Sequence, residues 1–141
     1  MERRDHIAGI IAGHRDREGP LLPILNDVQA LLGCVDDDAK VQIAEALNLS
    51  RAEVHGVVSF YHDYRASPAR LPVLKLCRAE ACQARGVEAL AKEIAGVAEG
   101  RYEIETVYCL GLCSVGPNAM IGGELHARLD ADKLARLVNA L

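Results

Sequence analysis

The chain has 141 residues, half of them hydrophobic and 26% charged, with a net charge of −4. This composition supports a packed core in one domain or two small ones. The 16 basic residues are scattered among 20 acidic ones, so the sequence has no basic stripe for the phosphates of nucleic acid. It also has no tryptophan on which bases could stack. We therefore expect no nucleic-acid partner.

The chain begins with a short apolar run at residues 7–13. This run is too short to span a bilayer, and the charged residues that flank it do not suit a secretory signal. Ile7, Ile10 and Ile11 instead indicate a weak first helix. We therefore expect a cytoplasmic protein with no direct membrane contact.

Three stronger helical patterns follow. The first repeats Leu21, Leu25, Val28 and Leu32 at helical spacing and stops at Gly33. The second follows the run Asp36, Asp37 and Asp38, which suits a helix start, and continues with Ala39, Ile43, Ala46 and Leu47. The third begins with a capping box of Ser50 and Glu53 and then places Val54, Val57, Val58 and Tyr61 on one face. Short connections predict a small helical bundle.

The pattern changes near Ser67-Pro68, which predicts an N-terminal helical domain at residues 1–68 and a second domain at residues 69–141. Residues 71–77 and 102–109 are typical of strands, and a helical stripe lies between them. A Gly-Gly hairpin and a last helix capped by Asp130 follow. The residues of the two stripes are Val87, Leu90, Ile94 and Val97, and then Leu134, Leu137, Val138 and Leu141. The expected fold class is α+β, with a small helical bundle followed by a thioredoxin-like α/β domain.

Five cysteines in a chain expected to be cytoplasmic favour metal or redox chemistry over disulfides, because the cytosol keeps thiols reduced. Four of them form two pairs, Cys77 with Cys82 and Cys109 with Cys113, and each pair follows a predicted strand. If the two strands are neighbours in one sheet, both pairs lie at the same edge and four thiols converge. An iron–sulfur cluster needs this arrangement, with two thiolates on each of two irons.

Spacing favours a cluster but leaves other interpretations open. A structural zinc site would use the same four thiols, although zinc pairs usually enclose two residues, whereas these pairs enclose four and three. A thiol–disulfide oxidoreductase would need a C-x-x-C pair, which the sequence lacks. Unligated core thiols are the last alternative, and this is the interpretation we give to the isolated Cys34.

Residues beside the two pairs would suit a charged cluster. Gly111 lets the backbone pass close to inorganic sulfide, so that loop N–H groups can donate to sulfur and raise the reduction potential. Arg78 and Arg85 would oppose the negative charge of a cluster, although Glu80 partly cancels them. Both arginines are equally well interpreted as solvated loop residues.

Three segments together resemble one protein family. Cys77-Arg-Ala-Glu-Ala-Cys82, Val107-Tyr-Cys-Leu-Gly-Leu-Cys113 and Gly56-Val-Val-Ser-Phe-Tyr61 are similar to the thioredoxin-like [2Fe–2S] subunit of NADH dehydrogenase, the 24 kDa subunit of respiratory complex I. Relatives of that subunit serve bidirectional hydrogenases and NAD-dependent formate dehydrogenases. The run at residues 56–65 most resembles the gamma subunit of the soluble molybdenum formate dehydrogenase.

The resemblance implies that Cys77, Cys82, Cys109 and Cys113 ligate one [2Fe–2S] cluster, and that the chain transfers electrons without performing bond chemistry. FMN, NAD and the molybdenum cofactor are then expected only in partner subunits. These partners are a flavin-binding subunit and a catalytic subunit. We expect the helical domain to dock onto the flavin-binding subunit. The equivalent subunit of an NAD-linked hydrogenase or NADH:quinone dehydrogenase is an alternative, and a structural zinc-binding interaction module is another.

Two segments depart from the family pattern. The long threonine-rich insertion of many respiratory relatives is shortened here to residues 100–105, which favours a small soluble complex. After Cys113 the chain reads Ser-Val-Gly-Pro117, where many relatives have an Ala-Pro pair. Gly116 therefore stands in place of an alanine, and we expect this change to be harmless.

Overall fold

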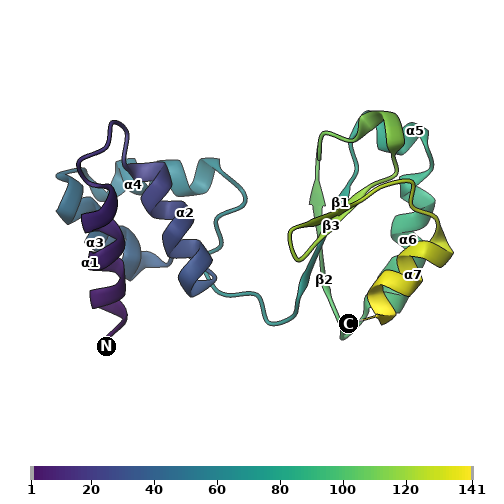
Figure 1. Ribbon diagram of the computed structural model, residues 1–141, viewed down its shortest axis with the longest axis horizontal. Coiled ribbons are helices and arrows are strands. Elements are labelled where there is room, and N and C mark those ends of the chain that lie inside the picture. The colour runs from purple at the N-terminus through teal and green to yellow at the C-terminus, as the bar shows by residue number, and fades with distance from the viewer. Residues whose placement is uncertain (1, 141) are drawn as a thin grey trace. The chain divides into compact units, whose positions relative to one another are not determined.

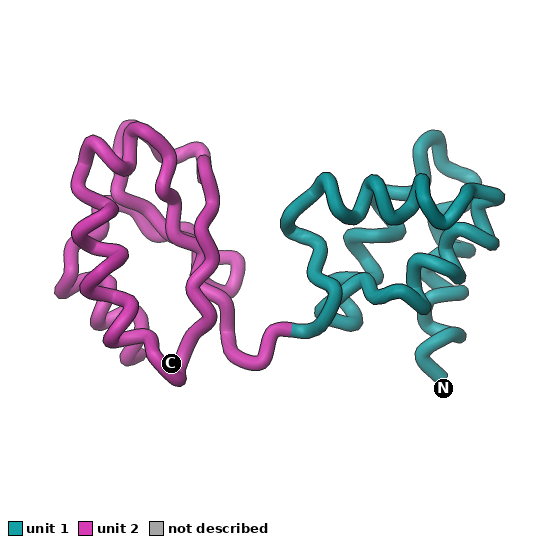
Figure 2. The backbone as a smooth tube through the Cα atoms, turned by 180° about the vertical axis from the view of Figure 1, so that it is seen from behind, with its two compact units in different colours: residues 1–68 teal, residues 69–141 magenta. Residues whose placement is uncertain are grey.

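The computed structural model describes residues 2–140 and divides the chain into two compact units, residues 1–68 and residues 69–141 (Figure 2). Each unit has a hydrophobic core of its own. Within the part of the chain that the structure describes, no helix has the length and apolar character needed to cross a membrane.

Over its described residues, 2–68, the first unit contains four helices: α1 (Arg3–His14), α2 (Leu21–Leu32), α3 (Asp37–Leu47) and α4 (Arg51–Phe60). Helix α1 packs against α2 and α3, and α3 also packs against α4. Their apolar stripes meet in one core, whose fully buried side chains include Ile24, Leu25, Val28, Ile43 and Val54.

Local signals in the sequence account for the ends of these helices. Gly33 ends α2 with a φ of 74°, a left-handed conformation that glycine adopts without strain. The Asp36 side chain accepts a hydrogen bond from the Ala39 N–H at 3.0 Å and so caps α3. At the start of α4, Ser50 and Glu53 form the expected reciprocal capping box. The helix predictions for this unit are confirmed.

The second unit is built on a four-stranded sheet in the order β2-β1-β3-β4, formed by β1 (Val73–Cys77), β2 (Glu103–Val107), β3 (Ala119–Ile121) and β4 (Glu124–His126). Strands β1 and β2 are parallel, and the other two pairings are antiparallel. Helices α6 (Val87–Ala98) and α7 (Ala131–Asn139) lie side by side on one face of the sheet (Figure 1). The predicted α+β fold class is confirmed.

The hairpin and the last helix form as predicted. Gly122 and Gly123 make the turn between β3 and β4 with φ values of 57° and 83°. Asp130 caps α7 by accepting a hydrogen bond from the Lys133 N–H at 2.7 Å. In the stripe of this helix, Leu134 and Val138 are buried and Leu137 packs against the core, whereas Leu141 lies outside the described residues.

Two short elements were not predicted, and one strand is shorter than expected. Helix α5 (Glu80–Ala84) and the 3₁₀ turn η1 (Cys113–Val115) lie together beyond the carboxyl ends of β1 and β2 (Figure 1). Strand β2 ends at Val107. The last hydrogen bond between β1 and β2 runs from the Arg78 N–H to the Val107 carbonyl, at 2.8 Å. Cys109 therefore lies in a loop rather than at the end of a strand.

Candidate functional site

The parallel pairing of β1 and β2 brings the two cysteine pairs to one edge of the sheet. Cys77, the last residue of β1, lies opposite Val107, the last residue of β2. Beyond these strand ends, α5 carries Cys82 and η1 begins at Cys113, and α5 contacts η1. The sequence predicted this convergence from the strand pattern alone.

One pair is buried and the other is exposed. Cys77 and Cys82 each expose 1% of their surface and belong to the core of the second unit, whereas Cys109 and Cys113 are exposed. The sulfurs of the exposed pair lie 3.8 Å apart. A tetrahedral metal with metal–sulfur bonds of about 2.3 Å holds two of its thiolates about 3.8 Å apart. The exposed pair is therefore spaced like two ligands of the same metal ion.

The thiols perturb one another's ionisation. Burial raises the pKa of Cys82, and the neighbouring Cys77 thiol and the charge on Cys113 raise it further, against a smaller opposing effect of Asn118. The adjacent Cys109 thiol raises the pKa of Cys113. Negative charge on one thiol thus disfavours it on the others, so four thiolates at this edge need a cation to neutralise them.

Hydrogen-bond donors reach one sulfur of each pair. The Gly111 N–H donates to Cys109 Sγ at 3.3 Å, from a residue with a φ of 77° that glycine adopts without strain. The Asn118 side-chain amide donates to Cys82 Sγ at 3.5 Å. Sequence reasoning missed Asn118, because an asparagine after a proline is typical of any turn.

Arg78, beside the first pair, does not act as a free cation over the sulfurs. Arg78 pairs with Glu88, through a bond from its Nε to Oε1 of 2.9 Å and a second bond from its terminal nitrogen to Oε2. These bonds lower the pKa of Glu88 and raise the pKa of Arg78. The positive charge of Arg78 is therefore compensated by Glu88 of α6. The sequence pattern had pointed only to its neighbour Glu80 for this role.

Gly116 lies in a narrow space beside Cys82. A Cβ atom at this position would lie 3.0 Å from Cys82 Sγ and 3.4 Å from Arg85 Cδ. A contact this tight requires the neighbouring atoms to move by a few tenths of an ångström. The glycine thus lets the backbone before Pro117 pass directly beside a proposed ligand.

The remaining cysteine belongs to the first unit. Cys34 is buried in the first unit, as expected for a core thiol. Among residues 2–140, no three His, Cys, Asp or Glu side chains are grouped so that they could hold one metal ion. The four thiols of the second unit thus meet as two pairs, and this donor set, with an N–H donor to each pair, fits two bridged irons.

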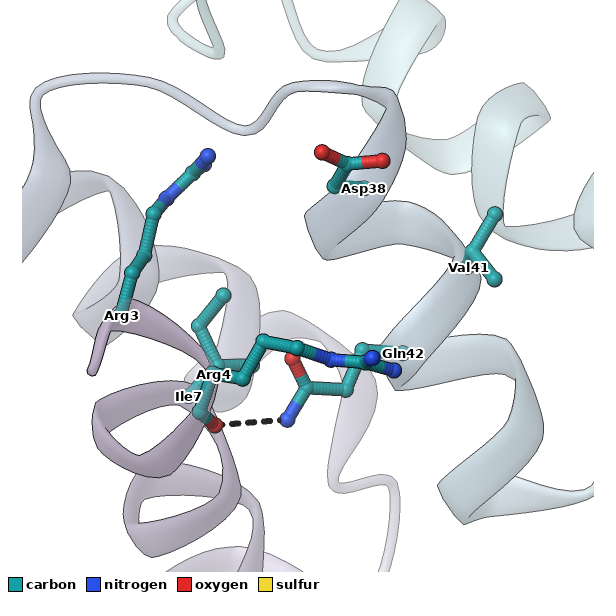
Figure 3. Close-up of a pocket in the computed structure, with 6 residues that line it drawn as sticks. All are labelled: Arg3, Arg4, Ile7, Asp38, Val41 and Gln42. Carbon is teal, nitrogen blue, oxygen red and sulfur yellow. Dashed lines mark hydrogen bonds between the residues drawn. The ribbon is translucent and has the colours of Figure 1, made fainter.

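The first unit contains a small pocket and a larger apolar groove. The pocket, of about 260 Å³, lies between α1 and α3, where Gln42 donates to the Arg4 carbonyl at 2.8 Å (Figure 3). The groove has about 710 Å³ and is lined mainly by apolar residues of α2, α3 and α4. Neither contains a cysteine, and neither holds a cluster of residues with catalytic chemistry.

Comparison with known proteins gives one family. The family model for thioredoxin-like [2Fe–2S] ferredoxins matches residues 7–141. One subunit of the NADH-quinone oxidoreductase of Rhizobium meliloti (strain 1021) is 28% identical over 149 residues, which cover 99% of this chain and 89% of that protein. The HndA subunit of the NADP-reducing hydrogenase of Solidesulfovibrio fructosivorans is 26% identical over 131 residues, which cover 86% and 77%.

A solved structure of an NAD⁺-reducing [NiFe]-hydrogenase in the H₂-reduced state contains a similar fold. The match has a TM-score of 0.67 and 25% sequence identity, and it covers 82% of this chain. This chain spans only 21% of the hydrogenase chain that it matches. The thioredoxin-like architecture predicted from the sequence is confirmed by these matches.

Proposed function

The chain belongs to the thioredoxin-like [2Fe–2S] ferredoxin family, and from this premise we propose that Cys77, Cys82, Cys109 and Cys113 hold its cluster. The observation that carries the proposal is the meeting of two thiol pairs at the carboxyl ends of two parallel strands. Contact within each pair supports Cys77 and Cys82 on one iron and Cys109 and Cys113 on the other. When bound, such a cluster takes up and releases one electron.

The residues around the thiols would set the reduction potential of the cluster. Cys77 and Cys82 bury one side of the site among apolar residues, which excludes water. Cys109 and Cys113 leave the other side at the protein surface, where a redox partner can approach. The Gly111 N–H stabilises negative charge on Cys109. The family match and this arrangement of thiols support electron transfer as the function.

This electron transfer serves an NAD-linked oxidoreductase complex, and we propose that the complex is a soluble molybdenum formate dehydrogenase with this chain as its gamma subunit. The similarity of residues 56–65 to that subunit and the short segment at residues 100–105 support this assignment. FMN, NAD and the molybdenum cofactor would then be bound by a flavin-binding partner and a catalytic partner.

A second candidate is the equivalent subunit of a hydrogenase or of an NADH-quinone oxidoreductase. It is favoured by the names of two relatives, one a hydrogenase subunit and one an NADH-quinone oxidoreductase subunit. The two candidates share the cluster and the flavin-binding partner, and they differ only in the donor or acceptor at the far end of the complex.

Spectroscopy of the isolated chain tests the cluster. After reconstitution with iron and sulfide, we expect about two irons per chain, a coloured oxidised form and an EPR signal on reduction. A colourless chain that holds one zinc ion would replace the proposal with the structural zinc module.

Co-purification tests the complex. The tagged chain, purified from its own organism under gentle conditions, is expected to bring with it an FMN-containing subunit and a molybdenum-containing subunit that together reduce NAD with formate. A complex that reduces NAD with hydrogen, or that oxidises NADH with a quinone, would establish the second candidate instead.

A further inference from the structure

Asn118 is the one amide or charged side chain that is buried among residues 2–140, with 1% of its surface exposed. It lies directly before β3, and its main-chain carbonyl accepts a hydrogen bond from the Cys77 N–H at 3.1 Å. A polar side chain in an apolar core destabilises the fold unless its groups are bonded. The bonds that Asn118 makes must therefore explain its position.

Both donors of the Asn118 amide point to the proposed ligand loops. The amide nitrogen donates to the Leu112 carbonyl at 3.0 Å, one residue before Cys113, and to Cys82 Sγ at 3.5 Å. This orientation follows from chemistry, because a flipped amide would set its oxygen against the Leu112 carbonyl with no proton between them. The amide thus connects a ligand of the buried pair to the loop of the exposed pair.

The acceptor of the same amide is left without a partner. Asn118 Oδ1 is buried and has no hydrogen bond. An unpaired buried acceptor lowers stability, and an apolar residue of similar size would avoid that loss. The side chain is therefore poorly explained as part of the core, and well explained by its two N–H bonds.

We propose that Asn118 is a positioning residue that holds Cys82 against the second ligand loop and, by donating to the Cys82 sulfur, raises the reduction potential. This inference rests on the proposed function, because it requires Cys82 to be an iron ligand. Reduction adds negative charge that spreads onto the ligand sulfurs, so an N–H donor stabilises the reduced form more than the oxidised form. Unlike the Gly111 N–H, this donor can be removed by substitution.

A one-electron redox titration of the full chain, loaded with iron and sulfide, tests the inference. The variants are Asn118→Leu, which keeps the volume of the side chain and removes both donors, and Asn118→Ala, which avoids any misfit of leucine. Each is expected to bind two irons and to shift the reduction equilibrium about tenfold toward the oxidised form, equivalent to about 59 mV for one electron. The control Leu134→Ala, in α7, should lower stability and leave the potential unchanged.

A second readout follows the hydrogen bond itself. Pulsed EPR of the reduced chain, with asparagine labelled with ¹⁵N in its side-chain amide, should detect a nitrogen coupling that both Asn118 variants lack. Unchanged potentials in both variants with two irons still bound would overturn the inference and leave the proposed function standing. A wild-type chain that takes up no cluster would overturn the proposed function, and the role of Asn118 with it.

Discussion

Cys77 lies opposite Val107 at the ends of two parallel strands, and this register decides where the four thiols meet. Successive residues of a strand face opposite sides of a sheet, so a slip of one residue would turn Leu74 and Leu76 out of the core and move Cys77 away from the end of β2. Leu74 and Leu76 hold the register, because both are fully buried against α6 and α7. The chemistry of the site thus depends on the packing of the sheet.

Substitution of any of the four paired cysteines by serine is expected to abolish or strongly destabilise the cluster. A serine hydroxyl is a harder and less acidic donor than a thiol and replaces the thiolate poorly on iron. Iron content, visible absorption and the EPR signal of the reduced chain measure the loss. Replacement of the buried thiols, Cys77 and Cys82, should also cost more stability, because serine brings a hydroxyl into the core.

Cys34→Ser is the matched control for this series. Cys34 is also buried, but it belongs to the first unit. We expect this variant to lower the stability of the first unit by about 1 kcal/mol and to keep two irons per chain. Iron loss from Cys34→Ser equal to that of the four others would show that the ligand set is assigned wrongly.

The Arg78–Glu88 pair is expected to tune the reduction potential in opposite directions when either partner is removed. Glu88→Gln leaves the arginine uncompensated next to Cys77, which should favour the reduced form, and Arg78→Gln should favour the oxidised form. Each shift should be smaller than about tenfold in the reduction equilibrium, because both side chains are partly exposed and screened by water and salt. Redox titration at low and at high salt measures the two effects.

The double variant provides the control for this prediction. With both residues changed to glutamine, no net charge is removed, and the potential should return close to that of the wild type. Shifts of the single variants that persist unchanged in high salt, or that have the same sign, would contradict an electrostatic origin.

Asp36 is expected to stabilise α3 through its charge as well as through its cap. Burial raises the pKa of Asp36, but the Ala39 N–H and the Arg3 guanidinium, at 2.6 Å, lower it by more, so the net pKa lies below its usual value of 3.8. A carboxyl with a lowered pKa contributes stability above the pKa of the unfolded chain and loses it as the pH falls through the folded value. The effect should therefore be present at pH 7 and disappear in acid below pH 3.8.

Two variants separate the cap from the charge. Asp36→Ala removes both and should cost about 1 kcal/mol at pH 7, and Asp36→Asn keeps a capping oxygen and should cost about 0.5 kcal/mol. Amide hydrogen exchange in α3 measures both losses. Asp38→Asn is the control, because it removes a charge from the same turn but leaves the cap and the Arg3 pair intact. A cost of Asp36→Asn that stays constant down to acid pH would refute the linkage.

The parts of the fold that sequence predicted are those decided by neighbouring residues. Gly33, Asp36 and Ser50 end or begin helices through bonds to the adjacent turn, and the Gly122-Gly123 turn follows from its own backbone. The cysteine pairs were found for a related reason, since each follows a strand and parallel strands end at the same edge.

The parts that sequence missed are decided by residues far apart in the chain. Arg78 finds Glu88 only when α6 folds back over the end of β1, and Asn118 finds Cys82 across 36 positions. Helix α5 is only one turn long and carries no periodic pattern that could predict it. The convergence of the four thiols was therefore predictable, whereas the groups that hydrogen-bond around them were not.

Gly116→Ala is expected to disturb the site although alanine is small. The new Cβ would lie 3.0 Å from Cys82 Sγ, and a sulfur bound to iron cannot move away freely. A displacement of the sulfur would lengthen its hydrogen bond from Asn118, which already measures 3.5 Å, and the reduction potential should fall in the same direction as in the Asn118 variants. Redox titration measures the fall, with Gly96→Ala as the control because its Cβ would meet nothing within 4 Å. The double variant Gly116→Ala with Asn118→Leu tests the route. If its fall in reduction potential equals the sum of the falls of the two single variants, the alanine acts by a route other than this hydrogen bond.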